Sequence, residues 1–434
     1  MRVKSLLEET FGVSDTVFQG VRIDADGVVV ADVRPVARRR NRCGFCGRRC
    51  ARYDNGGGRR RWRALDLGLS EAYLEADAPR VRCREHGVVV AQVPWARHDA
   101  GHTRHFDDQV AWLATRSSKT TVVGLMRIAW RTVGSILSRV WRDVEATHDR
   151  FAGLKRIGVD EVSYRKGQRY LLIVVDHDAR RLVWAAPGRN MATLDRFFDE
   201  LEASGEGRCA QITHVSADGA EWIDKVVAAR CPGAVRAADP FHVVKWATDA
   251  LDEVRREVWN EARRLARDEP KRKTGPVPAD APPRPHTDRA KALGKVRWSL
   301  WKNPENLTKN QEAKLEWIAT SHPVLYRAYM LKEGLRVVFK LPLDEAREAL
   351  ERWLSWAQRC RIAQFVKLRR SIIKHRDRIL AAIEHDLSNG LIESTNTKIR
   401  LITRVAYGFR SPEPLISLAM LSLGGHCPDL PGRE

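Results

Sequence analysis

The stretch from Arg156 to Ala186 reads RIGVDEVSYRKGQRYLLIVVDHDARRLVWAA. Its apolar segments are rich in Val, Ile, Leu, Tyr and Trp, which favour extended structure, and polar residues and a glycine separate them. The pattern predicts three consecutive strands, at residues 157–164, 170–175 and 181–186. Turns are expected at Arg165-Lys166-Gly167 and Asp176-His177-Asp178, where Asp176 and Asp178 serve the turn itself.

The sequence that follows adds helices and strands in alternation. An amphipathic helix is expected at 193–203, a strand at 212–217 that ends at Asp218, a helix at 219–229, and a strand at 234–238 that ends at Asp239. Three strands in a meander, then helix, strand, helix and strand, is the order of an RNase H-like α/β fold. Such sheets place functional residues at the ends of strands.

A long helical region, roughly 241–380, comes next. The Pro-rich basic stretch 271–285 interrupts it, and this stretch has too few apolar residues to pack. A last helix is expected to start near Gly390 and to carry Glu393. It must pack back over the sheet.

Three carboxylates in this arrangement indicate phosphoryl transfer. Asp160 lies in the first strand between Val159 and Val162, Asp218 ends the fourth strand, and Glu393 lies on the late helix. Carboxylates of this kind hold the pair of Mg²⁺ (or Mn²⁺) ions that cut and join phosphodiesters. A lone acid at a strand end more often caps a helix, and Asp218 could do so. Glu161 is expected to point to the other face of the sheet, exposed or in a salt bridge.

Composition points to a polyanionic partner. Lys and Arg number 76 against 55 Asp and Glu among 434 residues, a net charge of +21, which suits a polyanion such as nucleic acid. Two to four domains are expected at this length. No apolar run has the length of a membrane span and residues 1–9 lack a signal-peptide pattern, so we expect a cytoplasmic, nucleoid-associated protein with no membrane partner.

Four residues near the N-terminus predict a structural zinc site. Cys43-Gly44-Phe45-Cys46 and Cys83-Arg84-Glu85-His86 present two ligand pairs that can converge as a tetrahedron on a zinc-ribbon-like frame. Cys50 is expected to be a bystander. A hairpin is expected within residues 17–34, and Arg59, Arg60 and Arg61, between the two ligand pairs, are candidate DNA contacts.

Residues 105–145 show three helical patterns with a break near 127–131, which resembles a helix-turn-helix. The side chains expected to face a DNA groove are those of Thr132, Ser135, Ser138, Arg139 and Arg142. An ordinary helical spacer is the alternative interpretation.

Two further motifs resemble one family. Asp239-Pro240-Phe241-His242-Val243 and Gly390-Leu391-Ile392-Glu393-Ser394-Thr395-Asn396, the second followed by Arg404 and Tyr407-Gly408-Phe409, resemble signatures of insertion-sequence transposases of the ISL-three family. Gly158-Val159-Asp160-Glu161 fits the first catalytic strand of that family. The Cys/His pairs and the three-helix segment match its zinc-binding and helix-turn-helix regions, so the likeness covers nearly the whole chain. One departure is Ser394, at a position where relatives often have glycine.

The resemblance implies a DDE transposase with an RNase H-like core, magnesium, and binding of terminal inverted repeats and target DNA. It makes the helical stretch an all-helical insertion, and pairing of two DNA ends implies a homodimer or larger assembly. Either Asp218 or Asp239 could be the second carboxylate; we favour Asp218, with Asp239 and His242 as a supporting pair. The expected domains are 1–90 (hairpin and zinc), 91–150 (helix-turn-helix), 151–245 (core), 246–380 (insertion) and 381–434 (core, with Glu393).

Other interpretations stay open from the sequence. Lys398, Arg400 and Arg404 either contact DNA phosphates or form a solvated basic face. Trp298 and Trp301 could stack on a distorted base, although core packing is favoured. A structure-specific nuclease with the same core, and a repressor or decayed transposase that binds DNA without cutting it, are the competing functions.

Overall fold

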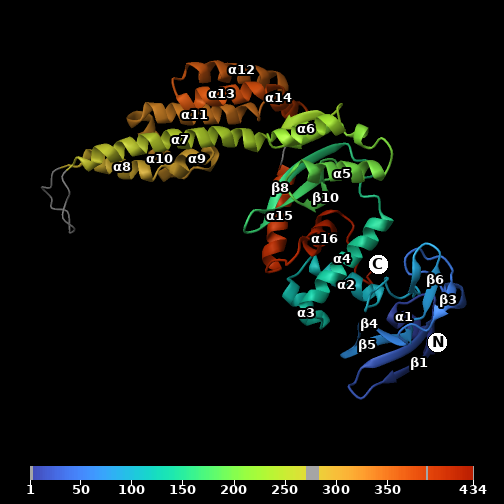
Figure 1. Ribbon diagram of the computed structural model, residues 1–434. Helices are drawn as coiled ribbons and strands as arrows, with labels where there is room; N and C mark the ends of the chain where they lie inside the picture. The colour runs from blue at the N-terminus through green and yellow to red at the C-terminus, as the bar shows by residue number, and fades with distance from the viewer. Residues whose placement is uncertain (1–2, 270–282, 388–389, 434) are drawn as a thin grey trace.

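The computed structural model describes residues 3–269, 283–387 and 390–433. Three regions follow one another along an elongated molecule (Figure 1): a helical bundle at one end, a five-stranded sheet in the middle, and smaller sheets near the N-terminus at the other end. In this described part of the chain, no helix is long and apolar enough to cross a membrane.

The central sheet has the strand order β10-β9-β8-β11-β12. β8, β9 and β10 are antiparallel neighbours, whereas β11 is parallel to both β8 and β12. All seven elements predicted from residues 157–238 are confirmed, with small shifts at their ends: β8 (Arg156–Arg165), β9 (Arg169–Asp176), β10 (Arg181–Pro187), α5 (Met191–Ala203), β11 (His214–Ala217), α6 (Glu221–Arg230) and β12 (Val235–Ala238). Asp176 makes the predicted turn, because its carboxylate accepts the backbone N–H groups of Asp178 and Ala179.

Helices cover both faces of this sheet. On one face α5 and α6 pack through Phe197, Phe198 and Ile223 against the apolar side chains of the strands. On the other face lie α15 (Gly390–Val405) and α16 (Pro412–Leu423), which also pack against helices α2 and α4 of the preceding region. Residues 390–423 therefore complete the core begun by β8, and they also pack against the upstream helices.

The region between β12 and α15 is helical throughout its described residues, as predicted. It contains α7 (Pro240–Arg267), α8 (Pro285–Gly294), α9 (Arg297–Trp301), α10 (Lys309–Ser321), α11 (Pro323–Val338), α12 (Leu343–Arg359), α13 (Ala363–Lys374) and α14 (Arg376–Glu384), around one apolar core. The Pro-rich stretch 271–285 lies mostly outside the described residues.

The N-terminal region forms two small sheets. One has the order β1-β2-β5-β4 and the other β3-β6-β7. The expected hairpin is confirmed as β1 and β2, but helix α1 was not predicted. The elements are α1 (Val3–Phe11), β1 (Thr16–Ile23), β2 (Val29–Pro35), β3 (Ala51–Asp54), β4 (Arg59–Leu67), β5 (Ser70–Asp77), β6 (Arg80–Cys83) and β7 (Gly87–Val90). Trp95 and Ala100 pack into the same core, so its packing extends past residue 90.

Three helices link the small sheets to the central sheet: α2 (Arg104–Ala114), α3 (Lys119–Met126) and α4 (Trp130–Thr147). The predicted break falls at Arg127, whose φ of 52° ends α3 in the left-handed conformation. α4 then begins at Trp130, and its apolar face, including Val133, Ile136 and Leu137, packs into the core shared with α15 and α16.

Candidate active site and metal centre

Three aspartates occupy matching positions on three adjacent parallel strands. Ala217 of β11 pairs with Val159 of β8 on one side and with Ala238 of β12 on the other. The residues that follow these three are Asp160, Asp218 and Asp239. Equal register therefore places the three residues at one level across the sheet, with the Asp160 side chain on the face that α15 covers, where Asn396 contacts it. β11 and β12 end at this level, so Asp218 and Asp239 directly follow the carboxyl ends of these two strands.

Helix α15 brings Glu393 over the same face. Gly158, two residues before Asp160, allows close approach, because a Cβ there would clash with Ile392 Cδ1 and lie 2.8 Å from His177 Nε2. One turn further along α15, the Nδ2 group of Asn396 donates a hydrogen bond to Asp160 Oδ2 (2.7 Å). Asn396 is only 4% exposed, and its Oδ1 has no hydrogen-bond partner. Contacts on both sides of Glu393 therefore fix its helix against β8.

The carboxylates influence one another electrostatically. Burial raises the pKa of Asp160, against the hydrogen bonds from the Glu161 N–H and from Asn396, and Asp218 raises it further. Burial also raises the pKa of Glu393, and Asp239 adds to the effect more than Asp160 does. Negative charge is therefore concentrated here and poorly solvated, which favours binding of a cation.

Glu161 departs in part from expectation. It forms the expected salt bridge, to Arg189 at 3.8 Å. Burial and then Asp218 raise the pKa of its carboxyl, so it also contributes to the negative potential of the site.

Asp239 and Asp218 differ in what their oxygen atoms already bind. Asp239 is 2% exposed; its Oδ1 accepts the Phe241 N–H (3.0 Å) as the N-cap of α7, and its Oδ2 pairs with His242 Nδ1. This hydrogen bond raises the pKa of His242. Asp218 accepts one backbone hydrogen bond, from Ala220 at 3.1 Å, and α6 begins without a side-chain cap. The helix-capping role considered for Asp218 thus belongs to Asp239.

Arg236 supports the end of β11 in a way that the sequence analysis missed. Its guanidinium donates to the backbone carbonyls of Val215 (3.0 Å) and Asp218 (3.3 Å), and it pairs with Asp224 at 2.8 Å. Asp224 in turn pairs with Arg378 of α14 (2.5 Å), so the helical region is tied to the strand end. A polar residue inside the short apolar strand 235–238 was the available signal.

The predicted zinc ligands come together. The Sγ atoms of Cys43, Cys46 and Cys83 and a ring nitrogen of His86 all lie within 4.8 Å of one another. The ligand atoms of Cys46 and Cys83 are 3.7 Å apart, those of Cys43 and His86 3.8 Å, and those of Cys83 and His86 3.6 Å. Ligands at about 2.1–2.3 Å from a tetrahedral Zn²⁺ stand at such distances, so the donor set fits zinc. Among the described residues no other group of His, Cys, Asp or Glu is this compact, and Cys50 is not part of it.

The residues expected to read DNA on α4 divide into two kinds. Ser135 and Arg142 are exposed, Thr132 and Ser138 are half-buried, and all four lie on or beside the open face of the helix. Arg139 instead makes two 2.9 Å hydrogen bonds to the buried carboxylate of Asp107 on α2. Its guanidinium holds the two helices together.

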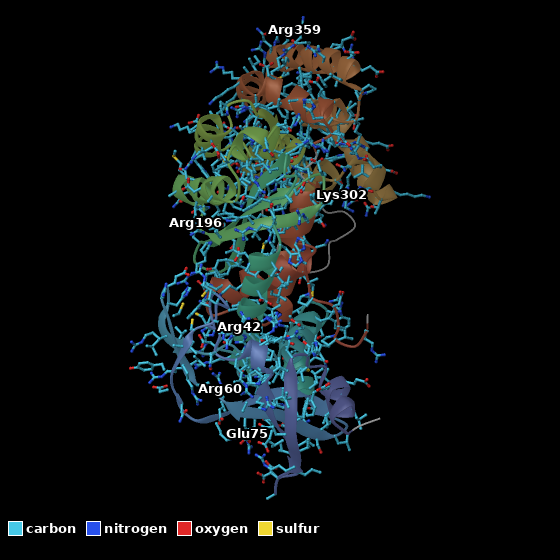
Figure 2. All side chains as sticks on the ribbon, turned by 90° about the vertical axis from the view of Figure 1, so that its right-hand side faces the viewer. Arg42, Arg60, Glu75, Arg196, Lys302 and Arg359 are labelled. Carbon is cyan, nitrogen blue, oxygen red and sulfur yellow. The ribbon has the colours of Figure 1, made fainter. Side chains whose placement is uncertain are left out.

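The arginines of β4 are similarly occupied. Arg59 and Arg61 both pair with Glu75 of β5, at 2.9 and 3.0 Å, while Arg60 donates to the Ala100 carbonyl at 2.8 Å. Figure 2 labels Arg60 and Glu75 in this region. Lys398, Arg400 and Arg404 on α15 are exposed, and no ion pair forms to them within the described residues.

The two candidate stacking tryptophans lie on and beside the surface of the helical region. Trp298 is 60% exposed, whereas Trp301 packs partly against the bundle core. The guanidinium of Arg297 lies over both rings, 5.7 and 3.9 Å from their centroids. The expectation of core packing is therefore confirmed for Trp301 and wrong for Trp298.

Comparison with known proteins assigns the class. A family model described as a transposase matches residues 157–419, one for the zinc-finger of transposases IS204/IS1001/IS1096/IS1165 matches 39–86, and one for the helix-turn-helix domain of transposase family ISL3 matches 91–141. The fold and the clustered carboxylates thus belong to a transposase.

Curated relatives agree with this class. The chain is 58% identical to the transposase for insertion sequence element IS1557 of Mycobacterium tuberculosis, over the whole of this chain and 98% of the relative. It is 26% identical to the transposase for insertion sequence element IS1001 of Bordetella parapertussis, over 86% of each chain. The protein belongs to the ISL3 family of transposases.

Proposed function

We propose that this protein binds the terminal inverted repeats of its insertion sequence and catalyses DNA strand cleavage and strand transfer, as a DDE enzyme with an RNase H-like core. The observation that carries the proposal is the equal register of Asp160, Asp218 and Asp239, with Glu393 held above them through the Asn396–Asp160 hydrogen bond. In this interpretation residues 246–380 are an insertion between the two parts of that core, and the chain keeps the five-part division expected from its sequence.

We assign Asp160, Asp218 and Glu393 as ligands of two Mg²⁺ or Mn²⁺ ions. When bound, the ions supply charge neutralisation for the transferring phosphate and activation of the attacking oxygen. The carboxylates of Asp160 and Glu393 fit this role because burial raises the pKa of each, and a bound cation would relieve the cost of their negative charge. Asn396 holds the Asp160 carboxylate in place, and its free Oδ1 remains available to a polar group in the site.

Asp218 is the favoured second carboxylate because Asp239 is already committed. Both Asp239 oxygens have partners, the helix α7 N-terminus and His242, and the side chain is buried. The stronger effect of Asp239 on the pKa of Glu393 supports the alternative. Under our assignment Asp239 and His242 form a pair that braces the site and places the imidazole beside it.

The remaining assignments concern binding. Cys43, Cys46, Cys83 and His86 hold a structural zinc ion, which stabilises the N-terminal region and takes no part in the chemistry. Thr132, Ser135 and Arg142 on α4 contact the repeat, and Lys398, Arg400 and Arg404 contact phosphates near the cut. Two ends must be paired, so the active form is a dimer or larger assembly.

The test is cleavage of a labelled duplex that carries the element's terminal repeat, in Mg²⁺ or Mn²⁺. Wild type is compared with Asp160→Asn, Asp218→Asn, Asp239→Asn and Glu393→Gln, with binding measured in parallel by mobility shift. Metal-dependent nicking at the repeat boundary is expected, lost in the Asp160, Asp218 and Glu393 variants while binding persists.

Each other outcome has a definite meaning. If Asp239→Asn abolishes nicking and Asp218→Asn does not, the second carboxylate is Asp239. Tight binding to the repeat with no cleavage by wild type in either metal would overturn the enzymatic proposal in favour of a DNA-binding repressor.

A further inference from the structure

A groove lies between the helix-turn-helix and the central sheet. Its wall comes mainly from α4, the end of β8, and the loop between α15 and α16, and residues such as His98, Asp99 and Lys119 add to it. It encloses about 1130 Å³. Its lining includes aromatic side chains from all three elements, namely Trp130, Tyr164, Tyr407 and Phe409. Tyr407 is 82% exposed and sits in the left-handed region with a φ of 51°, so its ring projects from the loop into solvent.

The charge of this groove is uncompensated. Lys119 and five arginines line it against only two acids, Asp99 and Glu413. Of the arginines, Arg139 is bound to Asp107, whereas Arg131, Arg142, Arg165 and Arg410 are exposed and form no ion pair with any described residue. Most other arginines in the N-terminal sheets pair with acids, as Arg59 does with Glu75. Unpaired guanidiniums gathered in one groove suit a row of phosphates.

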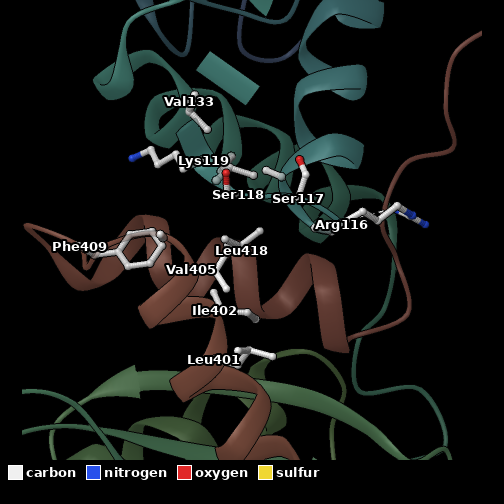
Figure 3. A pocket seen from close by; sticks show the side chains of 14 residues that line it. Arg116, Ser117, Ser118, Lys119, Val133, Leu401, Ile402, Val405, Phe409 and Leu418 are labelled. Carbon is white, nitrogen blue, oxygen red and sulfur yellow. Dashed lines mark hydrogen bonds between the residues drawn. The ribbon is translucent and has the colours of Figure 1, made fainter. Parts of the chain in front are cut away.

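The groove is held in a fixed relation to the catalytic helix. Figure 3 shows a neighbouring pocket, which shares Lys119 and Phe409 with the groove; there Leu401, Ile402 and Val405 of α15 lie below the turn before α3. Lys119, at the start of α3, places its Nζ over the rings of Trp130 (4.6 Å) and Phe409 (5.7 Å). These cation–π contacts join the DNA-reading helix to the loop that ends α15.

The distance from groove to active site follows from the secondary structure. β8 runs from Asp160 to Arg165, five residues at about 3.3 Å each, or roughly 16 Å. α15 runs in the same direction, since Ile392 meets Gly158 and Asn396 meets Asp160. From Glu393 to its end at Val405 it advances about 18 Å at 1.5 Å per residue. Both paths equal about five or six base pairs of duplex at 3.4 Å each.

We propose that this groove seats the DNA backbone between the repeat sequence read by α4 and the scissile phosphate, with Arg165 and Arg410 of the catalytic region contacting phosphates about five or six base pairs from the cut. The proposal rests on the proposed transposase function and adds to it a defined contact site and spacing. The catalytic region then contributes to end binding, and the helix-turn-helix and the active site grip one continuous DNA segment.

The experiment removes charge from each side of the contact. Binding of a terminal-repeat duplex is measured with single neutral methylphosphonates placed at each position up to ten base pairs from the cut. The proteins are wild type, Arg165→Ala, Arg410→Ala and, as a matched control, Arg352→Ala on the distal helix α12. For wild type, methylphosphonates five or six base pairs from the cut weaken binding. Each reduces the magnitude of the negative slope of log affinity against log salt by about 0.9.

For Arg165→Ala or Arg410→Ala the expected result is different. With unmodified DNA the magnitude of the slope is already smaller than in wild type by about 0.9. The same methylphosphonate then has little further effect, because the arginine that contacts this phosphate has been removed. Arg352→Ala behaves as wild type. Equal sensitivity of wild type and both groove variants at every position would overturn the inference. If wild type still binds and nicks the repeat in that case, the proposed function stands and only the groove assignment fails.

Discussion

The two candidate metal centres differ in how far apart their ligands lie along the chain and in how closely the ligand atoms approach one another. The Cys43–His86 cluster comes from two tight turns within 44 residues, and its four donor atoms already stand at tetrahedral distances. The carboxylate site draws on Asp160, Asp218 and Glu393, spread over 234 residues. Within the described chain its oxygens form no comparably compact group.

This difference separates a site made for stability from one made for reactivity. Soft ligands packed closely gain binding energy that adds to folding. Carboxylates that burial has pushed to raised pKa values cost folding energy and release that cost only when a cation or reacting group arrives. Substitutions should therefore have opposite signatures at the two sites.

The largest expected effect is on catalysis. Asp160→Asn or Glu393→Gln should lower the rate of DNA nicking by about a thousandfold or more, because the charge that holds the metal ions is lost. Zinc content and DNA affinity should stay as in wild type. Single-turnover cleavage at saturating protein measures this effect, and residual nicking within tenfold of wild type would contradict it.

The matching change at the other centre should act on structure. Cys83→Ser should reduce bound zinc from one ion per chain to none and unfold the N-terminal sheets, since a site of this kind adds folding energy. Metal analysis and limited proteolysis of residues 1–90 report this. Cys50→Ser is the control, because Cys50 lies outside the cluster and only donates to the Arg48 carbonyl. Zinc loss in the control would show that the ligand set is different.

A smaller effect is expected from Gly158→Ala, which changes no catalytic group. The added methyl collides with Ile392 and displaces α15, so nicking should fall by about ten- to a hundredfold through misplacement of Glu393. Trimming the neighbour, in Gly158→Ala/Ile392→Ala, should restore part of the rate. Gly233→Ala, where no atom lies within 4 Å of the added carbon, should have no effect. No rescue by the double variant would assign the effect to His177, whose Nε2 lies 2.8 Å from the added carbon, and not to Ile392.

The smallest expected effect is on thermal stability, and its sign tests whether the ionised Asp160 carboxylate destabilises the fold. A raised pKa means that Asp160 contributes most to stability below its unfolded pKa of about 3.8, and that this contribution is lost as pH rises through the higher folded value. At pH 7 without added magnesium, and with zinc bound in both proteins, the melting temperature of Asp160→Asn should therefore be about 1–2 °C higher than that of wild type. The free Oδ1 of Asn396 can accept the new amide after a flip. Adding magnesium should stabilise wild type only; a lower melting temperature for the variant would contradict the argument.

The strands of the central sheet could be predicted from the sequence because they carry nearly continuous apolar runs bounded by turns. Sequence reasoning could also place Asp160 within the first strand, and Asp218 and Asp239 at the ends of the fourth and fifth strands. It could not establish their common register, which depends on how β11 inserts between β8 and β12. Nor could it show that Arg139 is bound to Asp107 or that both oxygens of Asp239 are engaged, because these are facts of side-chain geometry. Trp298 was misjudged because its apolar character suggested burial.

Helix α7 extends from the candidate carboxylate site into the helical bundle. It begins at the Asp239 cap, with Pro240 in its first turn, and continues for 28 residues along the bundle. That length is about 42 Å. A displacement of the Arg267 end would therefore turn the helix about Asp239 and His242. The helical region is thus connected mechanically to the candidate carboxylate site through α7, as the C-terminal helices are through the start of α15.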